Sequence, residues 1–155
     1  LWVGDITYIP VEGIGFAYLA TLMDRYTRRI VGWDFRDDMT EQLTVTALQR
    51  SIRLVQPPAA LIHHTDRGGQ YAGTRYRGIL SRASIRQSMS RAGDCYDNAF
   101  MESCFGTLKT EMSMTEYKSM AVARRELIEY IDYYNTQRRH SSLGYLTPAQ
   151  FEAAA

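Results

Sequence analysis

The stretch Ile62-His63-His64-Thr65-Asp66-Arg67-Gly68-Gly69-Gln70-Tyr71 decides the fold of this chain. The apolar run at residues 59–62 follows the turn signal Pro57-Pro58 and predicts a short buried strand, while Arg67-Gly68-Gly69 predicts a loop. Asp66 therefore lies at the tip of a strand, where open α/β sheets place the chemistry of a ligand site. An aspartate that only caps the following turn would give the same local pattern, so the interpretation needs partner residues from elsewhere.

Length and composition bound the possibilities. The chain has 155 residues, of which 45% are apolar, and this predicts one globular domain with its own core. The net charge is only +1, but the charges are segregated, since residues 34–41 carry four acids against a single arginine. Residues 67–93 carry no acid and six arginines, namely Arg67, Arg75, Arg77, Arg82, Arg86 and Arg91. Such one-sided basicity indicates either a phosphate-binding surface or a solvated helix face.

Several classes of protein are disfavoured. Cys95 and Cys104 lie nine positions apart, and with only three histidines the chain lacks the ligand spacing of a zinc site. We expect two free thiols in a reducing cytoplasm. The longest apolar run, residues 16–23, is too short to span a bilayer, so no membrane contact is expected. The chain begins at Leu1 inside a strand pattern, and we expect it to be a fragment of a longer protein.

A second candidate site residue lies in the first predicted strand, residues 2–10. One face of this strand is predicted to carry Val3, Asp5, Thr7 and Ile9, while the residues between them point to the other face. Aspartate is depleted in strands, and one among apolar neighbours must be paired, hydrogen-bonded or bound to a cation. Asp5 is therefore a candidate ligand of a cation.

The remaining elements predict the fold class. Strands at 15–23 and 29–35 follow through short links and form an antiparallel meander, with Asp24 and Asp34 as turn and edge residues. Thr40 is placed to cap a helix over 41–55, which the prolines end, and a second helix over 74–81 precedes a strand at 84–89. We predict an α/β fold with a mixed five-stranded sheet, three antiparallel strands then two parallel strands, flanked by helices.

A helix over residues 97–112, with Asp97 as its N-cap, carries the apolar stripe Met101, Phe105, Leu108 and Met112. One residue beyond that stripe, Glu102, Gly106 and Lys109 form a line, and Glu102 and Lys109 differ by only about 20° around the axis. The exposed flank of a core helix would also look like this. A mid-helix glycine costs roughly 0.5–1 kcal/mol, however, and indicates close approach of another backbone.

The chain ends with a long helix that begins after Ser119. Its inward positions are predicted to be Met120, Ala123, Leu127, Ile131 and Tyr134, and its outward positions Arg124, Arg125 and Glu129. Beyond it, Arg138-Arg139 is suited either to hold phosphates or to place positive charge at a helix C-terminus.

Five motifs, taken together, carry a resemblance. They are WVGDITYIP (2–10), DRYTRRIVGW (24–33), HTDRGGQY (64–71), SMSRAGDCYDNAFMESCFGTLKTE (88–111) and YNTQRRHSSLGYLTPAQF (134–151). In this order they resemble the integrase-type catalytic core of bacterial insertion-sequence transposases with a D,D,E triad, and they span almost the whole chain. The sequence departs from that pattern at Asp94, where Asn is common, and at Cys104 and Gly106, where Phe and Ser often occur. None of these departures touches the triad, although Asp94 adds a negative charge to a loop near DNA.

The resemblance implies an RNase H-like fold and a triad of Asp5, Asp66 and Glu102, with thirty-five residues between the last two. Such a triad holds two Mg²⁺ ions, for which Mn²⁺ substitutes, about 3.5–4 Å apart. Asp5 would bridge both ions, while Asp66 and Glu102 would each hold one. The reaction is DNA strand cleavage and strand transfer, both of them in-line displacements at a phosphodiester.

The resemblance also implies partners and a location. The expected partners are DNA, as element ends and target, and further copies of the chain assembled on it, in the bacterial cytoplasm near the nucleoid. The expected DNA contacts are Lys109, Arg67, Arg91, Arg138 and Arg139. Residues 1–155 would be the catalytic core domain, without the upstream helix-turn-helix region that such transposases carry.

Two other classes of function are considered. An inactive RNase H-like module for DNA binding or assembly would gain affinity by losing three acids that repel phosphate, so the intact set argues against it. A nuclease on the same fold ranks lower because the flanking motifs match transposases. Its preference for an RNA–DNA hybrid over an element-end duplex would separate the two.

Overall fold

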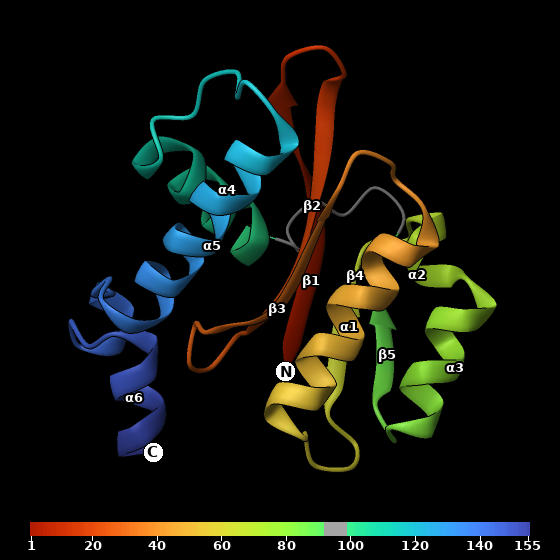
Figure 1. Ribbon diagram of the computed structural model, residues 1–155. Helices are drawn as coiled ribbons and strands as arrows, with labels where there is room; N and C mark the ends of the chain where they lie inside the picture. Colours follow the sequence, from red (N-terminus) through yellow and green to blue (C-terminus); the bar gives the residue numbers. More distant parts are fainter. Residues whose placement is uncertain (92–98) are drawn as a thin grey trace.

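The computed structural model describes residues 1–91 and 99–155, and its centre is a twisted five-stranded sheet with helices on both faces (Figure 1). The strand order is β3-β2-β1-β4-β5. The strands are β1 (Trp2–Val11), β2 (Gly15–Asp24), β3 (Ile30–Arg36), β4 (Ile62–Thr65) and β5 (Arg86–Met89). The first three pair antiparallel, and β4 and β5 run parallel to β1. The predicted mixed α/β sheet is confirmed.

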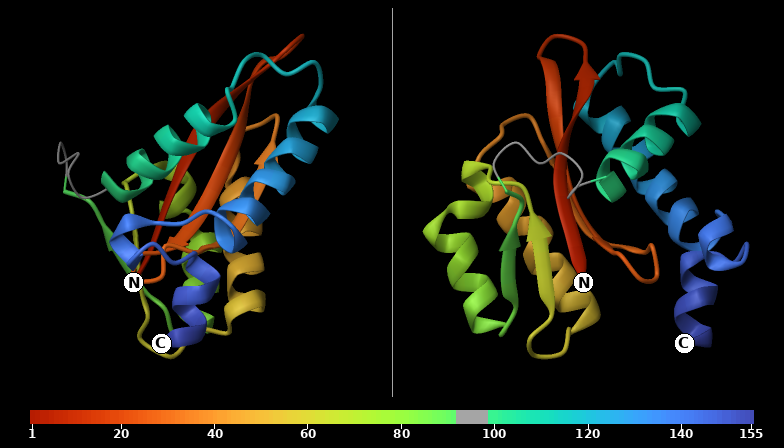
Figure 2. Two further views of the ribbon diagram at one scale, coloured as in Figure 1. Left: turned by 90° about the vertical axis from the view of Figure 1, so that its left-hand side faces the viewer. Right: turned by 180° about the vertical axis from the view of Figure 1, so that it is seen from behind.

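Helices form a layer on each face of the sheet, as the two views of Figure 2 show. The helices are α1 (Glu41–Val55), α2 (Gly69–Ala72), α3 (Thr74–Arg82), α4 (Ala99–Glu111), α5 (Met120–Thr136) and α6 (Pro148–Ala154), with the 3-10 helix η2 (Ser141–Leu143) between the last two. The first three cover one face, and α4 and α5 cover the other. No helix in the described part of the chain has the length and apolar character needed to cross a membrane.

Strand alternation in β1 divides the core into two clusters. Val3 and Ile9 belong to the cluster that includes α4 and α5, whereas Trp2 belongs to the cluster with α1 and α3. Successive strand residues point to opposite faces, so the side chain of Asp5 shares the face of Val3 and Ile9. The central strand therefore presents Asp5 to the layer that contains α4.

The predicted position of β4 is wrong by three residues. The apolar residues 59–61 form a turn, in which Ala60 adopts φ 66° and donates its N–H to the carbonyl of Ser84 at 2.8 Å. The strand is Ile62–Thr65, and its buried residues are His63 and Thr65. Because both are polar, apolar periodicity could not locate them. The end of this strand still falls just before Asp66, and α2 begins at Gly69 inside the predicted loop.

Two charged residues are covered by the fold to different degrees. Asp34 lies on the edge strand β3, as predicted, but is only 2% exposed, because Arg36 and Arg50 pair with its two carboxylate oxygens at 2.6 and 3.1 Å. Arg124, predicted to face outward, donates to the Phe35 carbonyl at 2.8 Å and covers the Phe35 ring. Asp24 is a turn residue as predicted, since its Oδ1 accepts from the N–H of Tyr26.

The long helices follow the predicted patterns. Helix α1 has the predicted bounds, although Thr40 occupies the N-cap position without a side-chain hydrogen bond. Ser119 caps α5 by accepting from the N–H of Val122. The proposed N-cap of α4, Asp97, lies outside the described residues. The expected apolar stripe of α4 is buried at Met101, Phe105 and Leu108, with Met112 packed against the cluster.

Candidate active site

Asp5 occupies the middle of β1 and is half-buried under the α4–α5 layer. Its Oδ1 accepts a hydrogen bond from the backbone N–H of Ile6 at 2.9 Å. The preceding Gly4 is needed for close packing against β4, since a Cβ there would lie 2.9 Å from Cε1 of His63. A larger residue at position 4 would push β4 away from β1, and with it the residue that follows β4.

The strand register places Asp66 beside Asp5. Trp2 pairs with His63 and Val3 with His64, so the offset is 61 residues in both pairs (63 − 2 and 64 − 3). The same offset joins Asp5 to Asp66 (66 − 5) just beyond the last bridge. Because neighbouring strands lie about 4.8 Å apart, the two carboxylates are neighbours at this edge of the sheet.

Asp66 also caps the turn that follows it. Its Oδ1 accepts from the N–H of Gly68 at 2.7 Å, and a Cβ on Gly68 would lie 2.9 Å from that oxygen. The turn-capping interpretation is therefore correct as a contact, but it uses one carboxylate oxygen only. Among the described residues Oδ2 has no hydrogen-bond partner, so the carboxylate keeps acceptor capacity for another ligand.

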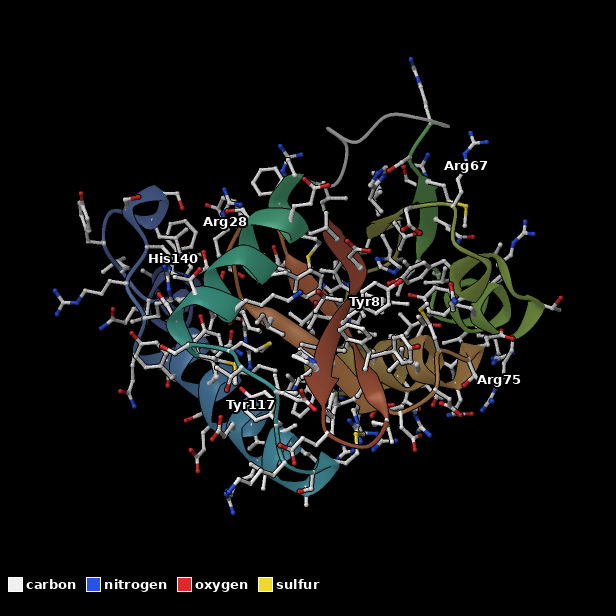
Figure 3. The ribbon with its side chains drawn as sticks, turned by 90° about the horizontal axis from the view of Figure 1, so that it is seen from above. Tyr8, Arg28, Arg67, Arg75, Tyr117 and His140 are labelled. Atoms are coloured by element: carbon white, nitrogen blue, oxygen red, sulfur yellow. The ribbon has the colours of Figure 1, made fainter. Side chains whose placement is uncertain are left out.

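Glu102 joins these two carboxylates from α4. The pKa of Asp5 is raised to about 6, mainly by burial and also by the nearby negative charges of Asp66 and Glu102, against the opposing hydrogen bond from Ile6. Figure 3 looks down on this end of the sheet, with α4 on one side of β1 and the loop bearing Arg67 on the other. Three carboxylates from three separate elements thus share one electrostatic neighbourhood.

The site is chemically suited to divalent cations that prefer oxygen. Its three carboxylates form no salt bridge with a lysine or arginine among the described residues. The pKa of Asp5 is raised mainly by burial, and the negative charges of Asp66 and Glu102 contribute in the same direction. In residues 1–91 and 99–155, no group of three or more acidic, histidine or cysteine side chains is arranged to hold a metal ion as it stands. Magnesium keeps several waters, so a few carboxylates that leave room for water and phosphate oxygens fit its preferences.

Two histidines beside Asp66 support the strands instead of binding metal. His63 is fully buried, and burial lowers its pKa to about 4, so the ring is neutral. Its Nε2 lies 2.6 Å from the hydroxyl of Tyr76, and its Nδ1 lies 3.4 Å from the carbonyl oxygen of Trp2. Both ring nitrogens of His64 are likewise engaged, with the hydroxyls of Ser88 and Ser90. These contacts leave neither ring a nitrogen for a metal ion.

Tyr71 is a neighbour of the site to which sequence analysis gave no role. It is fully buried on α2, and its hydroxyl has no hydrogen-bond partner among the described residues. Burial raises its pKa well above the ordinary value, and the negative charges of Tyr76, Asp5 and Asp66 add to that effect. The only sequence signal was its place in the motif after Asp66, and nothing in the spacing showed that α2 turns it back toward both aspartates.

The basic residues predicted to contact DNA occupy different settings. Arg67 is exposed and donates its Nε–H to the carbonyl of Ser90 at 2.7 Å, which places it next to Asp66. Arg91 is exposed at the end of the first described range, and Arg139 is exposed beyond α5. Arg138 is half-buried and paired with Glu111 at 2.7 Å. This ion pair leaves Arg138 less available than its neighbour.

Lys109 and Gly106 continue the line that begins at Glu102 on α4. Lys109 is half-buried near the C-terminal end of the helix. Gly106 is exposed, and a Cβ on it would have no neighbour within 4 Å. The close backbone approach expected at Gly106 therefore does not come from the described part of this chain.

Comparison with known proteins identifies the family. The family model described as "Integrase core domain" matches residues 1–95, and a second family model of the same description matches residues 83–148. The chain is 46% identical over 153 residues to the "Insertion element IS600 uncharacterized 31 kDa protein" of Shigella sonnei, covering 97% of this chain and 56% of that protein. It is 42% identical to the transposase for insertion sequence element IS904 of Lactococcus lactis, covering 98% of this chain and 60% of the relative.

A third relative is the transposase InsF for insertion sequence IS3A of Escherichia coli, at 44% identity over 97% of this chain and 53% of the relative. The chain thus spans between about half and three fifths of the length of these relatives. Solved structures share its fold at low sequence identity. The intasome of simian T-cell lymphotropic virus, in complex with the PP2A regulatory subunit B56 gamma, matches with TM-score 0.81 at 19% identity, over 97% of this chain and 52% of that chain.

The catalytic core domain of HTLV-2 integrase in complex with magnesium matches with TM-score 0.74 at 16% identity, over 97% of this chain and 93% of that chain. Both matches bear out the RNase H-like fold. The family models together span residues 1–148, which include all three acidic positions. The chain therefore belongs to the integrase core domain family, as the integrase-type core of insertion-sequence transposases.

Proposed function

We propose that this chain is the metal-dependent catalytic core of an insertion-sequence transposase, which cleaves DNA strands at element ends and joins them to target DNA. The observation that carries the proposal is the convergence of Asp5, Asp66 and Glu102 from β1, from the end of β4 and from α4. The names of the relatives, transposases of insertion sequences, support the choice of substrate.

The chemistry assigned to the site is an in-line displacement at a phosphodiester. Two bound Mg²⁺ ions would activate a water or 3′-hydroxyl and stabilise the leaving oxygen. Asp5, on the central strand, would hold these ions together with Asp66 and Glu102. Since the triad holds metal and forms no covalent bond to DNA, cleavage and joining use one set of residues with different nucleophiles.

Partners and location follow from the proposed reaction. Element ends and target must be held together, which requires several copies of the chain on one DNA assembly, in the bacterial cytoplasm where the nucleoid lies. One structural relative is an intasome, which supports the idea of an assembly. The recognition of element ends would belong to a region outside this core, within a longer protein.

The test replaces each acid by its amide. Asp5→Asn, Asp66→Asn and Glu102→Gln should each lower cleavage and joining by at least about 10³-fold, because each removes a metal-binding charge without changing side-chain volume. The measurement is Mg²⁺-dependent nicking and joining of labelled element-end duplexes, with the chain in its full-length protein. The matched control is Glu116→Gln, which removes an exposed acid just beyond α4 and should keep full activity.

The outcomes separate the proposal from its alternatives. Near-normal joining by any one of the three variants would remove that residue from the triad. A wild-type protein that binds DNA but never cleaves it, with either Mg²⁺ or Mn²⁺, would instead be an inactive binding module. Faster cleavage of an RNA–DNA hybrid than of element-end duplex would identify a nuclease.

A further inference from the structure

A second polar cavity lies beside α4, on a different face of the helix from Glu102. Its volume is about 390 Å³, and its polar lining consists of Arg28, Ser103, Thr107, Arg138, His140 and Ser142. Ser103 and Thr107 are turned about 100° and 140° from Glu102 around the helix axis. Figure 3 shows Arg28 and His140 next to each other on the side of α4 that faces the C-terminal segment. We call this cavity the Arg28 pocket.

The charge of the Arg28 pocket is positive. Among the described residues no acidic side chain lines it, and Arg28 forms no salt bridge with any of them. Burial lowers the pKa of Arg28, and the positive charge of Arg25 acts in the same direction. Both guanidinium groups lie over the Phe100 ring, at 4.3 and 4.4 Å from its centroid. An uncompensated, partly buried guanidinium is a ready partner for an anion.

His140 adds an unused hydrogen-bond donor. An N–H of Arg138 lies 3.4 Å from its Nδ1, and a guanidinium can only donate, so Nδ1 accepts and Nε2 carries the proton. Burial and the positive charges of Arg138 and Arg28 lower the pKa of His140 to about 4, which keeps the ring neutral at pH 7. Its Nε2 is closed to solvent and has no partner among the described residues. This N–H is thus unpaired but lies behind the surface of the pocket, where it adds a dipole and no direct contact.

The backbone at Arg28 is strained in a way that sets its side chain. Arg28 has φ 63°, in the left-handed region, and its N–H donates to the Asp24 carbonyl at 2.8 Å in the β2–β3 turn. A residue other than glycine costs about 1–2 kcal/mol there. Such strain concentrates where a side chain has a task other than stability. The turn holds an arginine over Phe100 where a glycine would be less strained.

We propose that the Arg28 pocket holds a backbone phosphate of the DNA strand that the Asp5–Asp66–Glu102 site processes, an inference that rests on the proposed function. The lining includes the Arg28 guanidinium and the hydroxyls of Ser103, Thr107 and Ser142, which are able to donate to phosphate oxygens. The volume accommodates a phosphate together with its sugar. Because the pocket and Glu102 lie on adjacent faces of α4, one strand passing over this helix reaches both.

The decisive variant is Arg28→Gln, which removes the charge but keeps a long polar side chain at the strained position. Its matched control is Arg29→Gln, one residue further along, where the arginine pairs with Glu152 outside the pocket. Binding of the full-length protein to an element-end duplex is measured between 50 and 200 mM salt. Arg28→Gln should weaken binding about threefold to tenfold at the lower salt and reduce the slope of log K against log salt by about 0.9. Arg29→Gln should change neither.

A second arm uses inorganic phosphate as the probe, without DNA. At matched ionic strength, millimolar phosphate should raise the melting temperature of the wild type, Arg29→Gln and Asp66→Asn more than chloride does, and should lose this effect in Arg28→Gln. If Arg28→Gln does not fold, Thr107→Val serves in its place. Removal of this neutral donor should weaken DNA binding and the phosphate effect while leaving the salt slope unchanged.

Loss of both the DNA slope and the phosphate effect in Arg28→Gln supports the inference. If Arg28→Gln loses the stabilisation by phosphate but keeps the wild-type salt slope of DNA binding, the inference is overturned, because the pocket would then take a small anion only. No effect in either arm also overturns it. Mg²⁺-dependent cleavage by the wild type, measured in the same preparations, separates the two proposals. If the wild type cleaves DNA but Arg28→Gln changes neither the salt slope nor the stabilisation by phosphate, the proposed function is retained and the phosphate site is not. If Arg28→Gln changes both but the wild type does not cleave DNA, only the phosphate site is retained.

Discussion

Asp5 shows how a single residue reports on its site. A carboxylate in the middle of a central strand must lose hydration, and two further acids face it, so its pKa rises to about 6. The protein retains this unfavourable charge without an arginine or lysine partner among the described residues. Asp34, also buried, contrasts with it because two arginines pair with its carboxylate. The carboxylate of Asp34 is paired within the fold, whereas that of Asp5 has no cationic partner among the described residues.

The metal-free protein should therefore lose stability as pH rises through the titration of Asp5. The pKa is 3.8 in the unfolded chain and about 6 in the folded one, so between these values the unfolded state binds fewer protons and the unfolding free energy falls. Asp5→Asn removes this effect and should be about 1–3 kcal/mol more stable than the wild type at pH 7.5, but not at pH 4. Urea denaturation in EDTA measures both values.

The comparison of wild type with Asp5→Asn cancels the histidines. His63 and His140 have pKa values lowered to about 4, so they act in the opposite direction, and both proteins gain stability from them as pH rises toward 6.5. A difference between the two proteins that stays constant from pH 4 to 7.5 would show that Asp5 does not titrate near pH 6.

Sequence alone identified the separate acids but not their convergence. Asp5 and Asp66 stood out because an aspartate inside a strand and another at a strand tip are both unusual, and Glu102 was assigned through resemblance to a family. The equal register offset that joins Asp5 to Asp66 is a property of β-pairing, which local patterns do not contain. The hydrogen bond between His63 and Tyr76 and the burial of Tyr71 beside the aspartates could not be predicted either, because they depend on which helices fold back onto which strand.

At the scale of elements, prediction was accurate where one face is apolar. Helices α1 and α5 matched their periodic patterns because their buried residues recur at helical spacing. Strand β4 did not match, because its buried positions are His63 and Thr65 and hydrogen bonds take the place of apolar burial. A strand held by a histidine–tyrosine contact gives no apolar signal.

Helix α4 carries two of the proposed roles along one line, metal binding at Glu102 and DNA binding at Lys109, and substitutions should affect them separately. Glu102 and Lys109 are about 10 Å apart along the axis, so one can hold a metal while the other reaches a phosphate. Lys109→Ala should reduce the salt slope of DNA binding by about 0.9 and leave stabilisation by Mg²⁺ unchanged. Glu102→Gln should do the reverse. Fluorescence titrations at several salt concentrations and melting curves with Mg²⁺ measure the two effects.

Substitutions at Gly106 test whether DNA passes over the same line of residues on α4, between Glu102 and Lys109. Because a Cβ there meets nothing within 4 Å, Gly106→Ala should stabilise the isolated protein by about 0.5–1 kcal/mol through helix propensity. Gly106→Leu should impair strand joining if DNA backbone passes over the helix at this point. An unchanged salt slope in Lys109→Ala, together with full joining by Gly106→Leu, would reduce this line to the exposed flank of a core helix.

The whole molecule is organised so that three elements meet where their charges conflict. The sheet fixes Asp5 and Asp66 side by side, and the α4–α5 layer adds Glu102 from above. Within the described residues no group of three or more acidic, histidine or cysteine side chains is arranged to hold a metal ion, so under the proposed function a bound ion would draw the acids together or complete its shell with water. Binding energy spent on drawing them together would not appear as affinity. The proposed function therefore makes the metal-free fold the less stable form at neutral pH.

Magnesium should accordingly stabilise the molecule, and more strongly at high pH than at low pH. An ion that binds the folded chain at about ten times its Kd adds about 1.4 kcal/mol, which raises the melting temperature of a domain of this size by about 3–6 °C. At pH 5 the proton on Asp5 competes with the ion, and a pKa of about 6 weakens apparent binding roughly tenfold relative to pH 7.5. The shift should therefore shrink at pH 5, and in Asp66→Asn it should shrink at both pH values because a ligand is gone.

Calcium should give a comparable shift but little cleavage, since its looser coordination does not hold the reacting oxygens in line. Differential scanning calorimetry with 10 mM Mg²⁺, 10 mM Ca²⁺ or EDTA measures all of these. An equal Mg²⁺ shift in wild type and Asp66→Asn would place the bound ions elsewhere on the protein, and the acidic neighbourhood would then be a repulsive feature of the fold without a metal to explain it.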